Sequence, residues 1–181
     1  MSLIPNPLHP AVVHLPVAIA VLVPIVAVGA LIFIKRGTGP RVAWGLMVGS
    51  LFALLLSGWV ALQTGEQQEE RVEDVVGDAP IHTHEEAADL FMLTTGVVLA
   101  IGLAGFAPGR VGRAGRWAAT LGTAAILGTG WNVGHTGGML VYRDGAASAY
   151  ASDGEVRSGG EDVERPSDRD RERRREDDDR R

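Results

Sequence analysis

Hydrophobic residues in this chain gather into four long stretches that short polar connections separate. The stretches cover residues 11–34, 42–63, 87–107 and 117–136. Each approaches the roughly 20 helical residues that cross a hydrocarbon core of about 30 Å. The run AIAVLVPIVAVGALIFI in the first stretch offers water no polar face, which disfavours a soluble helical protein. The pattern predicts an all-α integral membrane protein, an up-down four-helix bundle within residues 1–142.

Charge divides the connections into two kinds. Residues 35–41 (KRGTGPR) and 108–116 (PGRVGRAGR) are basic, whereas residues 66–86 are strongly acidic. Because basic connections stay on the cytoplasmic side, we expect a multi-pass protein of the cytoplasmic membrane with both termini on the outer side. Tryptophans at the ends of the stretches are expected to form interfacial belts, Trp44 and Trp117 on the inner side and Trp59 and Trp131 on the outer side.

The last segment, residues 143–181, is rich in Ser, Gly and charged residues and is predicted to be a disordered tail. Its arginines alternate with Asp and Glu, so we expect no nucleic-acid partner.

Local signals suggest where the helices begin and approach one another. Pro10 suits a first helical turn, and Pro16 and Pro24 predict kinks inside the first helix. Thr83 and Glu86 have the spacing of a capping box, which would begin the third helix. Glycines four residues apart predict faces where backbones or a flat ligand approach closely, at Gly45 and Gly49 and at Gly130, Gly134 and Gly138.

The ends of the second and fourth stretches resemble each other. Residues 57–65 read SGWVALQTG and residues 129–137 read TGWNVGHTG, with matching hydroxyl, Gly and Trp at the start and Thr-Gly at the end. The first and third stretches both open with paired histidines. We therefore predict two parallel helical-hairpin repeats, in which Gln63 of one half corresponds to His135 of the other.

Every histidine of the chain falls at one end of these stretches. If the helices alternate in direction, a single layer at the outer membrane face contains His9, His14, His82, His84 and His135. Ionisable groups in such positions usually have partners and often a function. The chain has no cysteine, which excludes disulfides, thiolate metal sites and covalently attached haem.

Two kinds of cofactor fit this layer. In the first interpretation, the layer binds haem b for electron transfer, with His14 and His84 facing each other as axial ligands and His135 as another ligand or a propionate partner. In the second, the protein is a non-redox site for Cu, Zn or Fe, serving transport or sensing, with His9, His14, His84 and His135 as ligands. Gln63, Glu66 and Glu85 would then supply oxygen ligands or hydrogen bonds to the ligands. A purely structural role of the histidines is the third interpretation.

No catalytic residue is predicted. His84 has no second histidine at the spacing of the HExxH zinc motif, and neither a phosphate-binding loop nor a GxSxG nucleophile motif occurs. Whether the protein is an enzyme stays open, with a redox subunit favoured over a hydrolase. The expected partners are the lipid bilayer and an external electron-transfer protein; the sequence predicts no oligomeric state.

Four motifs together resemble a known family. They are NPLHPAVVHLPVA, QTGE, HEEA and GHTGGMLVY, within residues 5–145. The chain is similar in these motifs to the prokaryotic membrane family catalogued as domain of unknown function 2231. The resemblance implies a four-helix membrane protein of unassigned function. It also implies that the motif histidines are His9, His14, His84 and His135, and that His82 is incidental.

Overall fold

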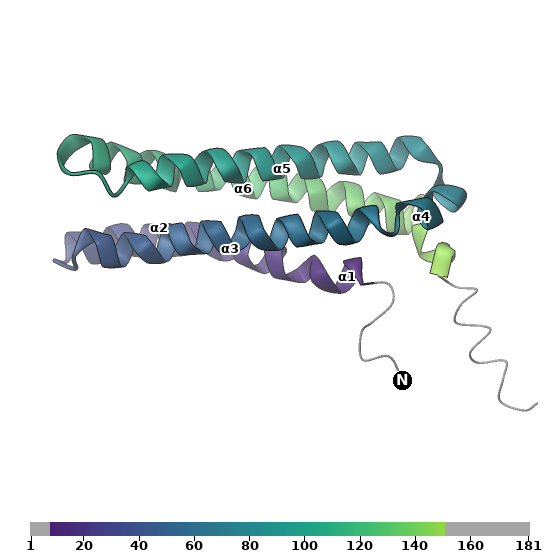
Figure 1. The fold of residues 1–181 in the computed structure, drawn as a ribbon, viewed down its shortest axis with the longest axis horizontal. Coiled ribbons are helices and arrows are strands. Elements are labelled where there is room, and N and C mark those ends of the chain that lie inside the picture. Colours follow the sequence, from purple (N-terminus) through teal and green to yellow (C-terminus); the bar gives the residue numbers. More distant parts are fainter. Residues whose placement is uncertain (1–7, 151–181) are drawn as a thin grey trace, which may run out of the picture. The chain divides into compact units, whose positions relative to one another are not determined.

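The computed structural model describes residues 8–150, and that part of the chain is helical with no strand (Figure 1). Its elements are α1 (His9–Val12), α2 (His14–Lys35), α3 (Pro40–Glu66), α4 (Glu69–Val76), α5 (Asp78–Ala104), α6 (Gly109–Tyr142) and the short 3-10 helix η1 (Ala146–Tyr150). The all-α prediction is confirmed for this range.

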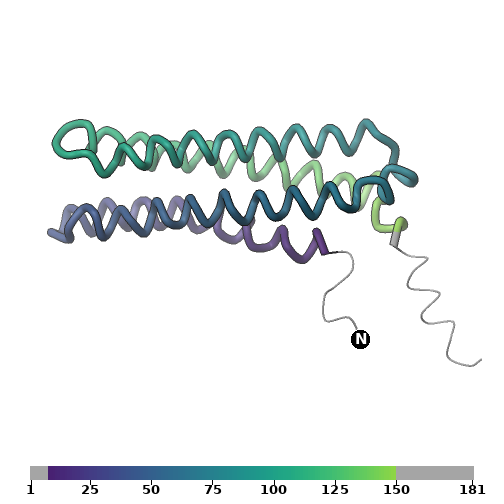
Figure 2. The backbone as a smooth tube through the Cα atoms, in the orientation of Figure 1, coloured from purple at the N-terminus to yellow at the C-terminus, as the bar shows by residue number. Residues whose placement is uncertain are grey.

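The long helices pack in a closed order, α2 on α3, α3 on α5, α5 on α6 and α6 on α2. Tight turns join α2 to α3 and α5 to α6 at one end, and α4 joins the two hairpins at the other (Figures 1 and 2). We call the first end the basic end, after its lysine and arginines. We call the second the histidine end; it comprises the starts of α1 and α5 and the ends of α3 and α6.

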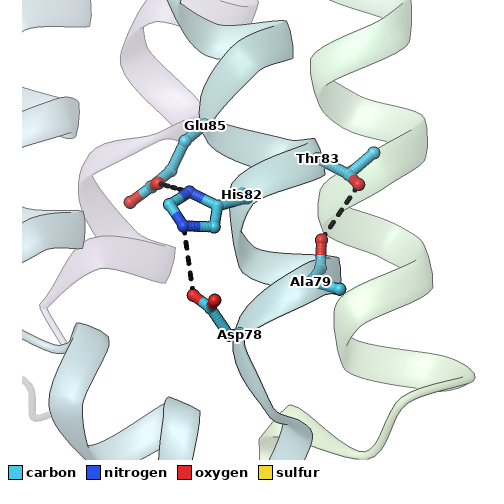
Figure 3. A network of polar contacts seen from close by, with 5 residues as sticks. All are labelled: Asp78, Ala79, His82, Thr83 and Glu85. Atoms are coloured by element: carbon cyan, nitrogen blue, oxygen red, sulfur yellow. Dashed lines mark hydrogen bonds and ion pairs between the residues drawn. The ribbon is translucent and has the colours of Figure 1, made fainter.

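The third long helix begins earlier than the sequence predicts. Thr83 lies inside α5, where its hydroxyl donates to the Ala79 carbonyl at 3.0 Å (Figure 3). The predicted capping box is therefore wrong. Gly77 separates α4 from α5 instead, with a φ of 81° that favours glycine. The acidic connection itself folds into α4.

At the start of the first helix, the prolines have the effects that the sequence predicts. Pro10 lies in the first turn of α1. The helix is interrupted at Val13, three residues before Pro16, whose missing N–H leaves the preceding turn short of a hydrogen bond. Pro24 lies inside α2, which continues through it to Lys35.

The predicted boundary between helix and tail lies where α6 ends. α6 stops at Tyr142, one residue before the predicted tail. Residues 146–150 form η1 rather than a disordered segment. The rest of the predicted tail, residues 151–181, lies outside the described residues.

Inward-facing positions recur about every seven residues along each long helix. In α3 they include Trp44, Leu51 and Gly58, interleaved with Met47 and Leu54. In the other helices many are small, among them Ala20, Ala27, Ala30, Ala88, Gly102, Gly112, Gly115 and Ala119. A spacing of three and four residues keeps one stripe facing the neighbouring helices, and small residues there let backbones approach closely.

Large apolar side chains point outward instead. Ile25 is 65% exposed, Leu46 67% and Leu93 66%. An apolar surface of this kind needs an apolar surrounding. Among the described residues, three segments are long and apolar enough to cross a membrane: His9–Lys35, Pro40–Glu66 and Asp78–Ala104. The chain is thus suited to a lipid bilayer, although α6, predicted as the fourth span, is not among these segments.

Trp44 is not part of an interfacial belt. Its side chain is fully buried, and its Nε1–H donates to the Gly102 carbonyl at 2.8 Å. The prediction that Trp44 lies at the membrane interface is wrong, because this residue belongs to the inward stripe of α3. Trp59, Trp117 and Trp131 are exposed.

Of the glycines predicted to make close contacts, only Gly130 does so. A Cβ at Gly45, Gly49, Gly134 or Gly138 would meet nothing within 4 Å, whereas one at Gly130 would lie 3.3 Å from the Phe91 ring. The tightest approaches surround the α5–α6 turn. There a Cβ at Gly105 would collide with the Trp44 indole and lie 2.8 Å from the Gly102 oxygen.

Gly105→Ala is therefore expected to destabilise the protein, by about 1–3 kcal/mol for an overpacked site. Gly49→Ala is the matched control, because this helical glycine faces open space. That change is expected to be neutral or to stabilise by about 0.4–1 kcal/mol. Thermal unfolding followed by circular dichroism in detergent measures both. Equal melting temperatures for the two variants would show that the Trp44–Gly105 packing is unimportant.

Candidate functional site

His9 turns its ring from α1 onto α3. Its Nδ1 atom lies 2.9 Å from the Ala61 carbonyl oxygen and 3.3 Å from the Thr64 hydroxyl. The ring also covers Gly65, where a Cβ would come within 3.3 Å of its Cε1 atom. The end of α3 therefore binds one imidazole nitrogen, and glycine leaves room for the ring.

His84 makes the corresponding contacts with α6. Its Nδ1 atom lies 3.0 Å from the Thr136 hydroxyl, and the Val133 carbonyl is a second acceptor near the ring. A Cβ at Gly137 would come within 3.0 Å of the His84 Cε1 atom. The end of α6 thus holds His84 as the end of α3 holds His9.

The two sets of contacts use the same spacing along their helices. Ala61, Thr64 and Gly65 on α3 correspond to Val133, Thr136 and Gly137 on α6. These are aligned positions of SGWVALQTG and TGWNVGHTG, and the shared Thr-Gly pair is the part that touches a histidine. The similarity in sequence therefore corresponds to a similarity in local structure.

The hydrogen bonds determine the tautomer of His9. A backbone carbonyl can only accept, so Nδ1 of His9 carries the proton and donates to Ala61. The Thr64 hydroxyl itself donates to the Ala61 carbonyl at 2.9 Å, which leaves its oxygen as an acceptor. Nε2 of the neutral ring then keeps its lone pair.

The same reasoning applies to His84. The Thr136 hydroxyl donates to the carbonyls of Asn132 and Val133, both at 3.1 Å, which leaves its oxygen to accept a hydrogen bond from an Nδ1–H of His84. A neutral imidazole whose Nδ1–H is bound to an oxygen presents Nε2 as a metal ligand. The contacts of both rings fit that form.

The two rings occupy one region of the histidine end. Each ring is half-buried, and the two rings are close enough for a positive charge on one to disfavour a positive charge on the other. They come from different hairpins, one from α1 and one from α5. Within residues 8–150, neither Nε2 atom has a hydrogen-bond partner. The structure therefore brings together two imidazoles with available nitrogens.

The remaining histidines lie outside this pair. His14 is exposed on α2, whereas His9 and His84 are half-buried, and the expected arrangement of His14 facing His84 as a ligand pair stays a prediction. His135 is exposed on α6 and lines a shallow hollow with Gly134 and Gly138. Both residues lie off the inward stripe of their helices, which explains their exposure.

His82 is held by carboxylates on the surface of α5. Its Nε2 lies 3.1 Å from Asp78 and its Nδ1 3.2 Å from Glu85 (Figure 3). The expectation that His82 is incidental to the site stays a prediction.

The predicted supporting residues do not contact the pair. Gln63 donates to Glu66 at 3.0 Å, and Glu85 contacts His82. Thr64 and Thr136 contact the two histidines instead. The Thr-Gly pairs shared by residues 57–65 and 129–137 are the sequence signal that identifies these threonines. Among the described residues, no group of three or more His, Asp or Glu side chains could hold a metal ion. The four histidines predicted as metal ligands are therefore not gathered into one such group.

No protein-family model matches the chain, and neither does any curated protein or solved structure. The resemblance to domain of unknown function 2231 stays an expectation from the motifs.

Thr136→Val should disturb His84 more than Thr64→Val disturbs His9, because His9 keeps its 2.9 Å hydrogen bond to the Ala61 carbonyl, whereas the Val133 carbonyl lies near His84 without such a hydrogen bond among the described residues. Such a hydrogen bond contributes about 1 kcal/mol. Nitrogen-15 NMR of the histidines at neutral pH measures the tautomers. We expect His84 to lose its pure Nδ1–H form in Thr136→Val and to keep it in Thr136→Ser. An unchanged His84 spectrum in Thr136→Val would contradict the assigned hydrogen bond.

Proposed function

We propose that this protein is a membrane cytochrome module in which His9 and His84 are the two axial ligands of one b-type haem, and that it exchanges electrons with an external partner protein. One observation carries the proposal. Two half-buried imidazoles from different hairpins lie near each other, each hydrogen-bonded through Nδ1 and with an Nε2 that has no partner among residues 8–150.

The donor set suits haem b. Its iron takes two neutral imidazoles and needs no cysteine, of which this chain has none. When a ligating imidazole binds a metal through one ring nitrogen, a hydrogen bond from its other ring N–H to an oxygen orients the ring and increases its basicity. When bound, haem supplies reversible one-electron transfer. The protein's part is to fix both rings and to surround the site with apolar helices.

The proposal includes the arrangement of the helices in the membrane. We infer that α2, α3, α5 and α6 all cross the bilayer as an up-down four-helix bundle of two repeated hairpins. α6 has low mean hydropathy because of its glycines, threonines and Asn132. Its outward face is nevertheless apolar, with exposed Val111, Trp117, Leu121, Leu127 and Trp131. Between Trp117 and Trp131 the exposed residues of α6 are apolar, and its exposed polar residues Asn132 and His135 lie toward the histidine end, where a membrane interface would accommodate them.

Charge supports the orientation that we propose. Near the basic end lie Lys35, Arg36, Arg41, Arg110, Arg113 and Arg116, and residues 14–65 and 90–142 contain no Asp or Glu. The acidic residues of α4 and the start of α5 lie at the opposite end. By the positive-inside rule, the basic end is cytoplasmic, and both termini and the haem site are on the outer side.

The test is an absorbance spectrum of the protein purified in detergent after expression with ample haem. We expect a Soret band and the spectrum of low-spin haem with two imidazole ligands. His9→Ala and His84→Ala should each lose that spectrum, because one axial ligand is gone. His14→Ala, His135→Ala and His82→Ala are matched controls on the surface and should keep it.

Several results would contradict the proposal. Absence of a Soret band in the wild-type protein is one, provided that circular dichroism shows a folded helical protein. Stoichiometric Zn or Cu without iron would favour the metal-binding alternative. Loss of the spectrum in His14→Ala but not in His9→Ala would overturn the ligand assignment while keeping the haem.

A further inference from the structure

A groove between α2 and α6 lies at the basic end, away from the histidines. Its volume is about 480 Å³. Leu31 and Ile32 of α2 form an apolar wall, and Trp117 of α6 lies beside them. Cationic side chains line the same groove, namely Lys35, Arg113 and Arg116.

The cations of this groove have no acidic partner from the helices that form it. Residues 14–65 and 90–142 contain no Asp or Glu, and no ion pair joins these three cations to another described residue. Arg116 is half-buried and donates to the Gly105 carbonyl, which fixes its guanidinium. The other guanidinium N–H groups, and the exposed Lys35 and Arg113, are available to an external anion.

We propose that this groove binds one anionic phospholipid, with the phosphate headgroup at Lys35, Arg113 and Arg116 and the upper part of an acyl chain against Leu31 and Ile32. Charge complementarity selects the headgroup, and the apolar wall selects a lipid over a free ion. The proposal rests on the membrane placement given above and is independent of haem.

The position of each group agrees with a lipid at a membrane boundary. A tryptophan at the headgroup level is typical of membrane interfaces, and Trp117 is 56% exposed beside the cations. Basic pockets between transmembrane helices bind anionic headgroups through the same chemistry. A volume of about 480 Å³ is in the range of small-molecule sites, which suits a headgroup with part of one chain.

Native mass spectrometry of the detergent-purified full chain tests the site, with equal amounts of phosphatidylglycerol and phosphatidylcholine added. The wild-type protein should retain phosphatidylglycerol preferentially. Lys35→Gln combined with Arg113→Gln should lower that retention by about 25-fold, about fivefold for each charge removed. Arg116 is left unchanged because it also binds the backbone.

Matched variants distinguish lipid binding at the groove from a general effect of positive charge and from a loss of folding. Arg41→Gln combined with Arg110→Gln removes the same charge outside the groove lining and should retain phosphatidylglycerol as the wild type does. Lys35→Arg combined with Arg113→Lys keeps the charges and should also retain it. Glycerol phosphate at millimolar concentration should not displace the lipid.

Three outcomes would overturn the proposal: equal retention of both lipids, equal loss in the groove and control variants, or displacement by glycerol phosphate. The haem spectrum is recorded in parallel, and the groove variants should leave it unchanged. A protein without haem that still prefers phosphatidylglycerol would contradict the proposed cytochrome function alone. A protein with haem and no lipid preference would contradict the lipid site alone.

Discussion

An imidazole on the packed side of an apolar helix needs an oxygen for its N–H, because neither lipid acyl chains nor aliphatic side chains can accept a hydrogen bond. Leaving such a group unpaired costs about 1–3 kcal/mol. At the histidine end, the acceptors are the carbonyl and threonine oxygens near the ends of α3 and α6. Once Nδ1 is bound there, the ring cannot rotate freely, and Gly65 and Gly137 are the positions that let it lie on the helix. The available Nε2 atoms, and therefore the proposed chemistry, depend on these bonds.

The seven-residue repeat decides which histidines reach this position. His9 continues the stripe of Pro16, Val23 and Ala30, and His84 continues that of Phe91 and Val98. His14 lies two residues before Pro16 and so lies on another side of the helix. This register is visible in the sequence, so the His9–His84 pair was predictable in principle. Locating the histidines by membrane depth alone could not separate His9 from His14, because both lie near the start of the first span.

The sequence predicted the helices and their apolar character well, and their packed faces poorly. In a soluble protein, polar residues mark the outside of a helix; here both sides are apolar, as exposed Ile25 and buried Val23 on α2 illustrate. Trp44 was therefore assigned to an interface although its indole is packed inside against Gly105. Gly45 and Gly49 were assigned to a close contact although they face open space. Small residues are frequent on the packed stripes of α2, α5 and α6, whereas the stripe of α3 contains Trp44, Met47, Leu51 and Leu54, so neither polarity nor size alone identifies the packed face.

The same constraint applies at both ends of the protein: a polar group on an apolar helix pairs with the nearest available acceptor or anion. His9 and His84 reach backbone carbonyls or hydroxyls of the adjacent helix, and Arg116 reaches the Gly105 carbonyl at the α5–α6 turn. Lys35 and Arg113 have no acidic residue on the helices beside them, so an anion that pairs with them would come from outside these helices. In a bilayer, the available anions at that depth are lipid phosphates. Internal acceptors thus fix the histidines at one end, and the lack of internal anions favours a bound lipid at the other.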